Sequence, residues 1–255
     1  CFLFETDSTK RTSGMKHKFL FILLFSLVLE GMVTTQAVAG DYVHQVNTLI
    51  GTKGTGLTSG YLYPGATYPY GMVQFTPSYF SKRSGFVINQ LSGGGCEHMG
   101  NFPTFPVKGK LKMSPDNILN YRISVSEEKG HAGYYEAMVQ EDIKAKLTVT
   151  ERTGMASYEY PADQQYGTII IGGGISATPI EQAAIVITAP NKCEGYAEGG
   201  NFCGLRTPYK VYFIAEFDTD ALETGTWKRE ELMPNTTFAE GEYTGVDLTV
   251  DENKK

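Results

Sequence analysis

The chain has 255 residues, of which 41% are hydrophobic and 12% aromatic, and its formal net charge is −6 at pH 7. This length suits one large all-β domain or two small domains, and the aromatic content is ample for a core. The mild negative charge, without any basic run, argues against nucleic acid or an anionic membrane surface as a partner.

The beginning of the chain has the pattern of an export signal. After Met15, a basic segment (Lys16–Lys18) precedes an apolar core (Phe19–Leu29), and Ala37–Ala39 forms an A-x-A cleavage site. The apolar core is too short to cross a bilayer, so a membrane anchor is the weaker interpretation. The predicted division is an upstream extension without function (1–14), a signal peptide (15–39) and a domain (40–255) exported to the periplasm, the cell surface or the medium.

Glycine, proline and aromatic residues dominate the next stretch, Asn47–Pro106, which is almost free of charge. The glycine and proline density excludes a long helix, and a disordered linker would not carry so many large aromatic side chains. The composition therefore predicts an ordered, loop-rich surface whose backbone approaches a ligand closely and whose rings stack on it. Such a surface suits a sugar, which has apolar C–H faces and a rim of hydroxyls.

Beyond Gly109 the pattern becomes that of β-strands. Apolar residues alternate with polar ones from Ala145 to Val149, and a turn at Arg152–Gly154 leads into a second alternating stretch, Ala156–Tyr160. One helical turn, over Lys228–Met233, is the only helical element expected. Short strands with glycine and proline between them predict an all-β sandwich. Further strands are predicted at Tyr121–Val125, Gly133–Gln140, Thr168–Ile171, Ile185–Ala189 and Val211–Phe217.

Five ordered segments carry a family resemblance that covers nearly all of residues 41–250. They are LIGT with YPGATYPYGMVQFTP (within Leu49–Pro77), LSGGGCEHMGNFPTFPVKG (Leu91–Gly109), GHAGYYEAMV (Gly130–Val139), LTVTERTGMASYEYP (Leu147–Pro161) and Gly195–Asp218. Together they resemble the amino-terminal domain of glycoside hydrolase family 92, the bacterial, calcium-dependent, exo-acting α-mannosidases.

The resemblance implies a large antiparallel β-sandwich of the galactose-mutarotase type, incomplete at its carboxy-terminal end and followed in the natural protein by a helical catalytic domain. It implies that the full-length protein is an inverting α-mannosidase that removes terminal mannose from glycoprotein glycans, usually at α-1,2 linkages. The acid, the base and most calcium ligands of the family lie in the catalytic domain. The chain alone is therefore expected to be inactive, and no catalytic or metal-binding residue is assigned to it.

The resemblance also indicates which residues meet the sugar. The glycine-rich second segment lies near the pocket in the family, which implies sugar contacts for Gly94, Gly95, Cys96 and Asn101. The rings of Tyr68 and Tyr70 either stack on the sugar or fill the end of the sandwich. Many family members carry an insert with a tryptophan and a histidine before the second segment, and its absence here leaves the linkage specificity open.

Other chemical groups give weaker indications. Glu97, beside the glycine run, is the best-placed carboxylate, although a solvated loop residue is the more ordinary explanation, and Glu194 and Glu198 flank Tyr196. The run Gly172–Ala177 fits G-x-G-x-x-A, but Pro179 and the lack of a following helix argue against phosphate binding.

Three cysteines follow the predicted cleavage site, an odd number, so at least one thiol is free. Cys193 and Cys203 are the only candidate disulfide pair, and Cys96 is expected to be free.

Two interpretations other than an enzyme domain remain at this point. One is a stand-alone carbohydrate-binding or adhesive module, and the other is a structural sandwich that packs on a catalytic partner without touching sugar.

Overall fold

The computed structural model of the protein describes residues 42–52, 62–78, 85–93, 99–116, 124–200 and 204–252. Contacts divide the chain into two units, Cys1–Tyr42 and Val43–Lys255, and every strand belongs to the second. The described residues form sixteen β-strands and one short 3-10 helix, η1 (Tyr42–Gln45). The predicted extension and signal peptide lie outside the described residues. Within the described part of the chain, no helix is long and apolar enough to span a membrane.

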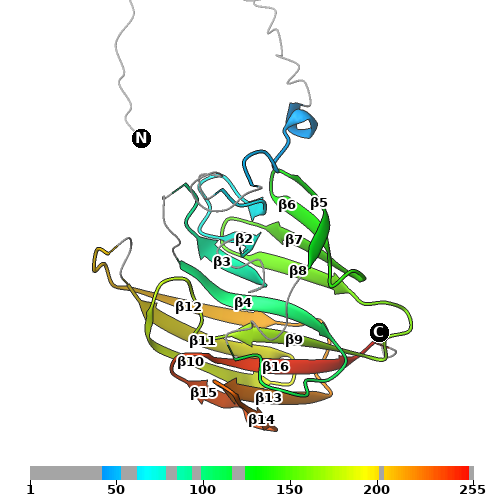
Figure 1. The fold of residues 1–255 in the computed structure, drawn as a ribbon, viewed down its shortest axis with the longest axis vertical. Helices are drawn as coiled ribbons and strands as arrows, with labels where there is room; N and C mark the ends of the chain where they lie inside the picture. Colours follow the sequence, from blue (N-terminus) through cyan, green and yellow to red (C-terminus); the bar gives the residue numbers. More distant parts are fainter. Residues whose placement is uncertain are drawn as a thin grey trace, which may run out of the picture. The chain divides into compact units, whose positions relative to one another are not determined.

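An eight-stranded antiparallel sheet, the central sheet, organises the second unit (Figure 1). Its strands in spatial order are β1 (Ala66–Thr67), β2 (Gln74–Pro77), β3 (Phe86–Gln90), β4 (Met99–Lys108), β9 (Tyr166–Gly172), β16 (Thr244–Asp251), β13 (Glu223–Lys228) and β14 (Glu231–Pro234).

Two four-stranded antiparallel sheets complete the unit. In Figure 1 the sheet of strands β5–β8 appears in green, and strands β10–β12 of the other sheet appear in yellow and orange. The meander sheet contains β5 (Val125–His131), β6 (Tyr134–Val139), β7 (Ile143–Val149) and β8 (Gly154–Glu159). The β10 sheet contains β12 (Tyr209–Glu216), β11 (Lys192–Gly199), β10 (Ile180–Ala189) and β15 (Phe238–Glu240).

The central sheet is apolar on both faces. Ile170 and Ile171 are neighbours on β9, so their side chains point to opposite faces, and they belong to two different hydrophobic clusters. The first cluster joins the central sheet to the meander sheet, with Phe86 stacked on Tyr158 at a ring-centroid distance of 6.2 Å. The second joins it to the β10 sheet, where Phe102 lies 4.2 Å from the ring of Phe213. Each smaller sheet therefore covers one face of the central sheet.

The structure confirms the predicted all-β antiparallel fold and most of the predicted strands. The alternating stretches on either side of Arg152–Gly154 are β7 and β8, paired from Lys144–Glu159 to Val149–Gly154. The main-chain bond from Thr150 to Thr153 closes their turn at 2.8 Å. The predicted strands after residue 130 correspond to β6, β9, β10 and β12.

Three local predictions need correction. Lys228–Met233 is not helical, because Arg229 adopts φ 53° and reverses the chain between β13 and β14. The strand predicted at Tyr121–Val125 begins only at Val125, and residues 121–123 lie outside the described residues. The region Asn47–Pro106 is less loop-rich than predicted, since it contains β1, β2, β3 and most of β4.

Cys193 is a free thiol buried under the β10 sheet. The candidate disulfide with Cys203 is not formed by Cys193 in the structure, and Cys203 itself lies outside the described residues. Burial, with a smaller contribution from the Glu194 carboxylate, raises the pKa of the Cys193 thiol to about 12.

We predict that Cys193 resists alkylation in the folded protein. A buried thiol with a raised pKa presents little thiolate, so iodoacetamide at pH 8 should modify it at least roughly tenfold more slowly than in the unfolded chain. Peptide mapping by mass spectrometry measures each cysteine separately. Equal rates in the folded and unfolded chain would contradict the burial of this thiol.

Asp247, on β16, is a buried carboxyl with an unusual environment. Its side chain is 8% exposed, and no described group bonds to its Oδ1 atom. Burial, followed by the nearby Glu223 carboxylate, raises the pKa of Asp247 to about 6. An aspartate in the unfolded chain has a pKa of about 3.9, so the folded state holds this proton to higher pH. The contribution of Asp247 to the free energy of unfolding is therefore fully present below about pH 4 and is lost as the pH rises through about 6.

We predict that Asp247→Asn stabilises the protein at pH 7.5 and leaves its stability at pH 4 nearly unchanged. The difference of about two pKa units corresponds to about 3 kcal/mol. Thermal unfolding at the two pH values measures the effect, and the exposed Asp220→Asn is the control. A gain of equal size at both pH values would show that burial of the charge is not its cause.

Candidate functional site

One end of the central sheet gathers the segments that the sequence singles out. Because β2, β3 and β4 are antiparallel neighbours, the start of β2, the end of β3 and the start of β4 lie together. The turn Tyr68–Gly71 precedes β2, and residues 91–98 connect β3 to β4. The connection 173–179, after β9, reaches the same place because β9 is antiparallel to β4. We call this place the β4-start end.

Much of the predicted glycine-rich group has no described position. Gly94, Gly95 and Cys96, and the neighbouring Glu97, lie outside the described residues. Their contacts with sugar stay predictions. Asn101 is the member of this group that the structure describes.

Asn101 lies in a strand and not in a loop, which corrects its expected setting. It pairs with Ile88 of β3, and its side chain is 2% exposed. Its Nδ2 atom donates to the hydroxyl of Tyr209 at 3.1 Å, and that hydroxyl lies 3.3 Å from Asn101 Oδ1, to which it donates. The amide therefore has a partner within the protein for both its donor and its acceptor, and contact of Asn101 with sugar stays a prediction.

The first residue of β4 is held by three hydrogen bonds. The Met99 main-chain nitrogen donates to Thr178 Oγ1 at 2.7 Å. The Met99 carbonyl accepts from Ser176 Oγ at 2.8 Å and from the Ala177 main-chain nitrogen at 2.9 Å. Ser176 Oγ also lies 3.5 Å from the Tyr209 hydroxyl. These contacts fix the point at which the glycine-rich segment joins the sheet.

The backbone at this point is strained. Met99, Gly100 and Phe102 have φ angles of 57°, 73° and 52°, and only glycine adopts such values without cost. The pairing of β3 with β4 is also irregular here, with an extra residue on β4 between Asn101 and Thr104. A bulge with left-handed residues persists only where the surroundings hold it, and such strain is concentrated at functional sites.

The second predicted group, Tyr68 and Tyr70, lies in a turn at the same end. The Gly71 main-chain nitrogen donates to the Tyr68 carbonyl at 3.0 Å, with Pro69 and Tyr70 at the turn's centre. Tyr70 has φ 58°, the left-handed value that a type II turn requires after proline and that usually selects glycine. Its ring is fully exposed, and the Tyr68 ring is 48% exposed. The turn displays both rings to solvent and does not pack either into the core.

Hydrogen bonds to neighbouring elements hold this turn in place. The Met72 main-chain nitrogen donates to the Glu151 carbonyl at 2.6 Å, in the turn between β7 and β8. The Asn89 side chain donates to the Met72 carbonyl at 2.9 Å and accepts from the Gln74 main-chain nitrogen at 2.8 Å. The exposed rings are therefore carried by a fixed backbone, which lowers the entropy cost of stacking on a ligand.

The two carboxylates of β11, Glu194 and Glu198, do not form the pair that inversion at a glycosidic centre requires. Glu194 and Glu198 are four residues apart on β11, or about 13 Å along a strand, whereas inverting pairs are about 6.5–9.5 Å apart. Glu198 is also paired with Lys210. Among the described residues, no group of three or more His, Cys, Asp or Glu side chains could hold a metal ion.

Sequence reasoning missed the groups that hold β4. Tyr209 is 108 residues from Asn101, and no local pattern around either residue predicts the hydrogen bond between them. Ser176 and Thr178 belong to the glycine-rich connection between β9 and β10, where the sequence motif indicates at most phosphate binding. The local signal available was the run of short polar residues after a buried strand, which is typical of side chains that bond to nearby backbone.

Comparison with known proteins agrees with this fold. The model of the glycosyl hydrolase family 92 N-terminal domain matches residues 45–255. A protein of Arthroderma benhamiae described as an uncharacterized secreted glycosidase is 30% identical over an alignment of 159 residues, and the match covers 53% of this chain and 20% of that protein.

Two solved structures share the fold. A family GH92 α-mannosidase from Bacteroides thetaiotaomicron has a TM-score of 0.69 and 24% identity, over 82% of this chain and 31% of its own. An inverting GH92 mannosidase from the same organism has a TM-score of 0.67 and 22% identity, over 82% and 29%. The chain thus spans less than a third of these relatives. With the family model matching most of its length, the chain belongs to the glycosyl hydrolase family 92 N-terminal domain family.

Proposed function

We propose that this chain is the amino-terminal domain of a longer, exported bacterial glycoside hydrolase that removes terminal mannose from glycoprotein glycans with inversion. The observation that carries the proposal is the family match over residues 45–255. The solved relatives are named mannosidases, one of them inverting, and the curated relative is named a secreted glycosidase. The predicted signal peptide, residues 15–39, supports export. An α-1,2 linkage is the family's usual substrate and is our working choice.

The domain's part in this reaction is to position groups around the sugar. Inversion needs one carboxyl to protonate the leaving oxygen and one carboxylate to activate water on the opposite face. Since Glu194 and Glu198 are too far apart for this, and the family resemblance implies that both groups lie in the catalytic domain, the acid and the base belong in this proposal to the rest of the protein. The β4-start end supplies a fixed backbone from the Met99 bonds and two exposed rings in the Tyr68–Gly71 turn.

Tyr209 is a positioning residue in this proposal. Its hydroxyl joins Asn101 of β4 to Ser176 of the β9–β10 connection, and Ser176 in turn bonds the Met99 carbonyl. The hydroxyl therefore acts on the segment before Met99 through other residues, and does not itself contact sugar.

The proposed longer protein would also need calcium, as its family resemblance implies. The described residues contain no group of three or more His, Cys, Asp or Glu side chains that could hold an ion, so we assign calcium no ligand and no step here.

A stand-alone carbohydrate-binding module is the second candidate function. The exposed rings of Tyr68 and Tyr70 favour it, because a binding module needs stacking surfaces and no acid or base. The two candidates differ in whether a longer natural protein that contains this chain hydrolyses mannosides.

We predict that the chain from Asp41 to Lys255 does not hydrolyse an aryl α-mannoside, with or without millimolar calcium. The longer natural protein should do so with calcium and lose activity when a chelator is added. Release of the aryl group, followed by absorbance, measures both. Turnover by the chain alone that disappears in Glu97→Gln would overturn the assignment of the acid and the base to the rest of the protein. An inactive longer protein that still binds mannosides would favour the binding module.

We predict that Tyr209→Phe in the longer protein lowers kcat/KM about tenfold, since it removes the hydroxyl that links Asn101 to Ser176. The loss should fall mainly on kcat, because a displaced backbone stabilises the transition state less well than the ground state. Tyr166→Phe, at the opposite end of the central sheet, is the matched control. A lower melting temperature with unchanged kcat and KM would leave Tyr209 with a purely structural role.

A further inference from the structure

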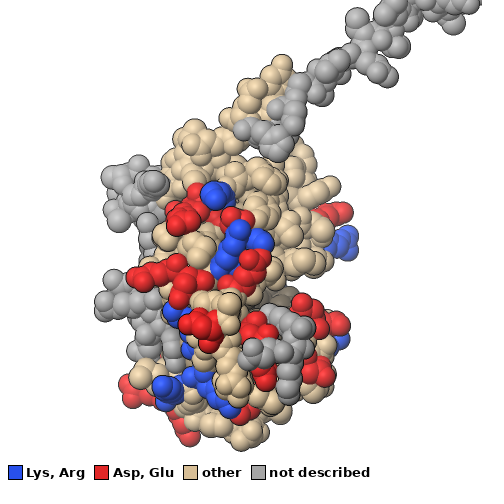
Figure 2. Space-filling view, turned by 90° about the vertical axis from the view of Figure 1, so that its right-hand side faces the viewer, with Lys and Arg blue, Asp and Glu red and all other residues tan. Residues whose placement is uncertain are grey.

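The two outer sheet faces of the unit differ in chemistry. On the meander sheet, outward side chains form an ion-paired lattice, in which Glu136 lies 3.3 Å from Lys144, and Lys146 pairs with Glu159. The side of the molecule in Figure 2 likewise shows basic and acidic side chains interspersed. On the β10 sheet the outward side chains include Tyr196, Tyr212, Ile214 and Phe238, three of them more than half exposed. One face has the composition of a solvated surface and the other does not.

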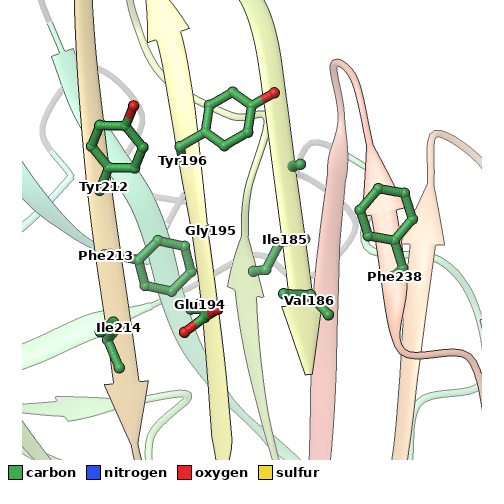
Figure 3. A pocket seen from close by; sticks show the side chains of 10 residues that line it. Ile185, Val186, Glu194, Gly195, Tyr196, Tyr212, Phe213, Ile214 and Phe238 are labelled. Carbon is green, nitrogen blue, oxygen red and sulfur yellow. The ribbon is translucent and has the colours of Figure 1, made fainter. Parts of the chain in front are cut away.

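These side chains surround an open depression across β12, β11, β10 and β15. Tyr196 and Tyr212 are directly opposed on neighbouring strands, with ring centroids 6.0 Å apart and ring planes 47° apart. Figure 3 shows these two rings on one side of the depression and Phe238 on the other. Val186 pairs with Phe238 and contributes to the apolar floor between them.

A cation fixes part of this surface. The ammonium group of Lys210 lies 4.1 Å from the ring centre of Tyr196 and 5.4 Å from that of Tyr212, and it pairs with Glu198. These contacts hold the Tyr196 ring against its neighbours. The Tyr212 ring is 71% exposed and offers the larger free face.

One carboxylate within the depression is available to a ligand. Glu194 lies between Ile214 on β12 and Val186 on β10, and among the described residues no hydrogen bond or ion pair engages it. An apolar protein surface, whether of another protein or of the rest of the proposed longer protein, would bury this charge without compensation, which is costly. A second copy of the chain in a two-fold contact would bring two such carboxylates into one apolar interface. A ligand with several hydroxyl donors satisfies the carboxylate directly.

We propose that the outer face of the β10 sheet is a glycan-binding platform, separate from the β4-start end. A pyranose ring stacks its C–H face on Tyr212, and its hydroxyls donate to Glu194. The two sites lie on opposite sides of β12, since Tyr209 and Tyr212 are three residues apart on one strand and side chains alternate. The platform holds the polymer near the domain while the other site meets its end. The choice of mannose as the sugar rests on the proposed function.

The test is affinity electrophoresis of the chain in native gels that contain soluble α-mannan, a soluble β-glucan or no polymer. The parent should be retarded by α-mannan. Tyr212→Ala should bind about tenfold more weakly, and Tyr212→Phe, which keeps the ring, should bind nearly as well as the parent. Met155→Ala, which removes a 65% exposed side chain from the meander sheet, is the matched control. Circular dichroism checks that each variant is folded.

Each outcome decides between the alternatives. Retardation by β-glucan alone, lost in Tyr212→Ala, keeps the platform and contradicts the mannose specificity of the proposed function. Equal retardation of the parent and Tyr212→Ala, or no retardation of the parent in either polymer, overturns the platform. Sedimentation velocity tests a second copy of the chain as the occupant. A dimer that dissociates in Tyr212→Ala, without retardation of the parent by either polymer, would assign this face to a second copy.

Discussion

The burial of the central sheet on both faces is the constraint on which the rest of the structure depends. A sheet with Ile170 on one face and Ile171 on the other is stable in water only when two further layers cover it. The fit is close, since a Cβ atom added at Gly245 would lie 2.2 Å from the Trp227 ring. Trp227 is completely buried, and its indole nitrogen donates to the Asp116 carbonyl at 3.0 Å. This close fit packs two neighbouring strands of the central sheet, β13 and β16, against each other.

This layering explains why the candidate site lies at one end of the central sheet. Both faces are occupied by core, so a ligand has access only to the strand ends and to the outer faces of the covering sheets. The β4-start end is where three pairs of antiparallel strands begin or end together. The left-handed residues Met99 and Phe102 are retained there against their conformational cost. Met99 accepts a hydrogen bond from Ser176 and donates one to Thr178, and Phe102 packs on Phe213.

How well the sequence predicts each element follows from how each is buried. The hairpin β7–β8 and strand β12 were predictable because each has one covered and one exposed face, which produces alternation. Strand β4 was not, because it is buried on both faces and contains Pro103 and Pro106 among its residues. The turn at Arg229 was not predictable, because no neighbouring residue indicates that this charged residue adopts a positive φ in a two-residue turn.

The candidate site was predictable only in its local parts. The family resemblance indicated Asn101, and the composition of Asn47–Pro106 together with the resemblance indicated the rings of Tyr68 and Tyr70 as candidates for sugar contact. The partner of Asn101 could not be found in this way, because its hydrogen bond to Tyr209 spans 108 residues and leaves no periodic signal. The apolar outer face of β12 was present in the sequence as Tyr212 and Ile214. It could be recognised as a surface only after Val211 and Phe213 were seen to pack against the core.

Strand β12 contributes one residue to each of the two proposed sugar-binding regions. Its inward residue Tyr209 reaches the strained start of β4, and its outward residue Tyr212 stands on the opposite side in solvent. Neither region needs an acid or a base of its own. The described carboxylates on β11 are too far apart for inversion, and one of them is neutralised by Lys210. In our proposal, a domain with exposed rings on a fixed backbone holds the glycan while groups elsewhere in a longer protein cleave it. The favourable burial of the central sheet on both faces holds the backbone that carries these rings, and so supports the binding geometry.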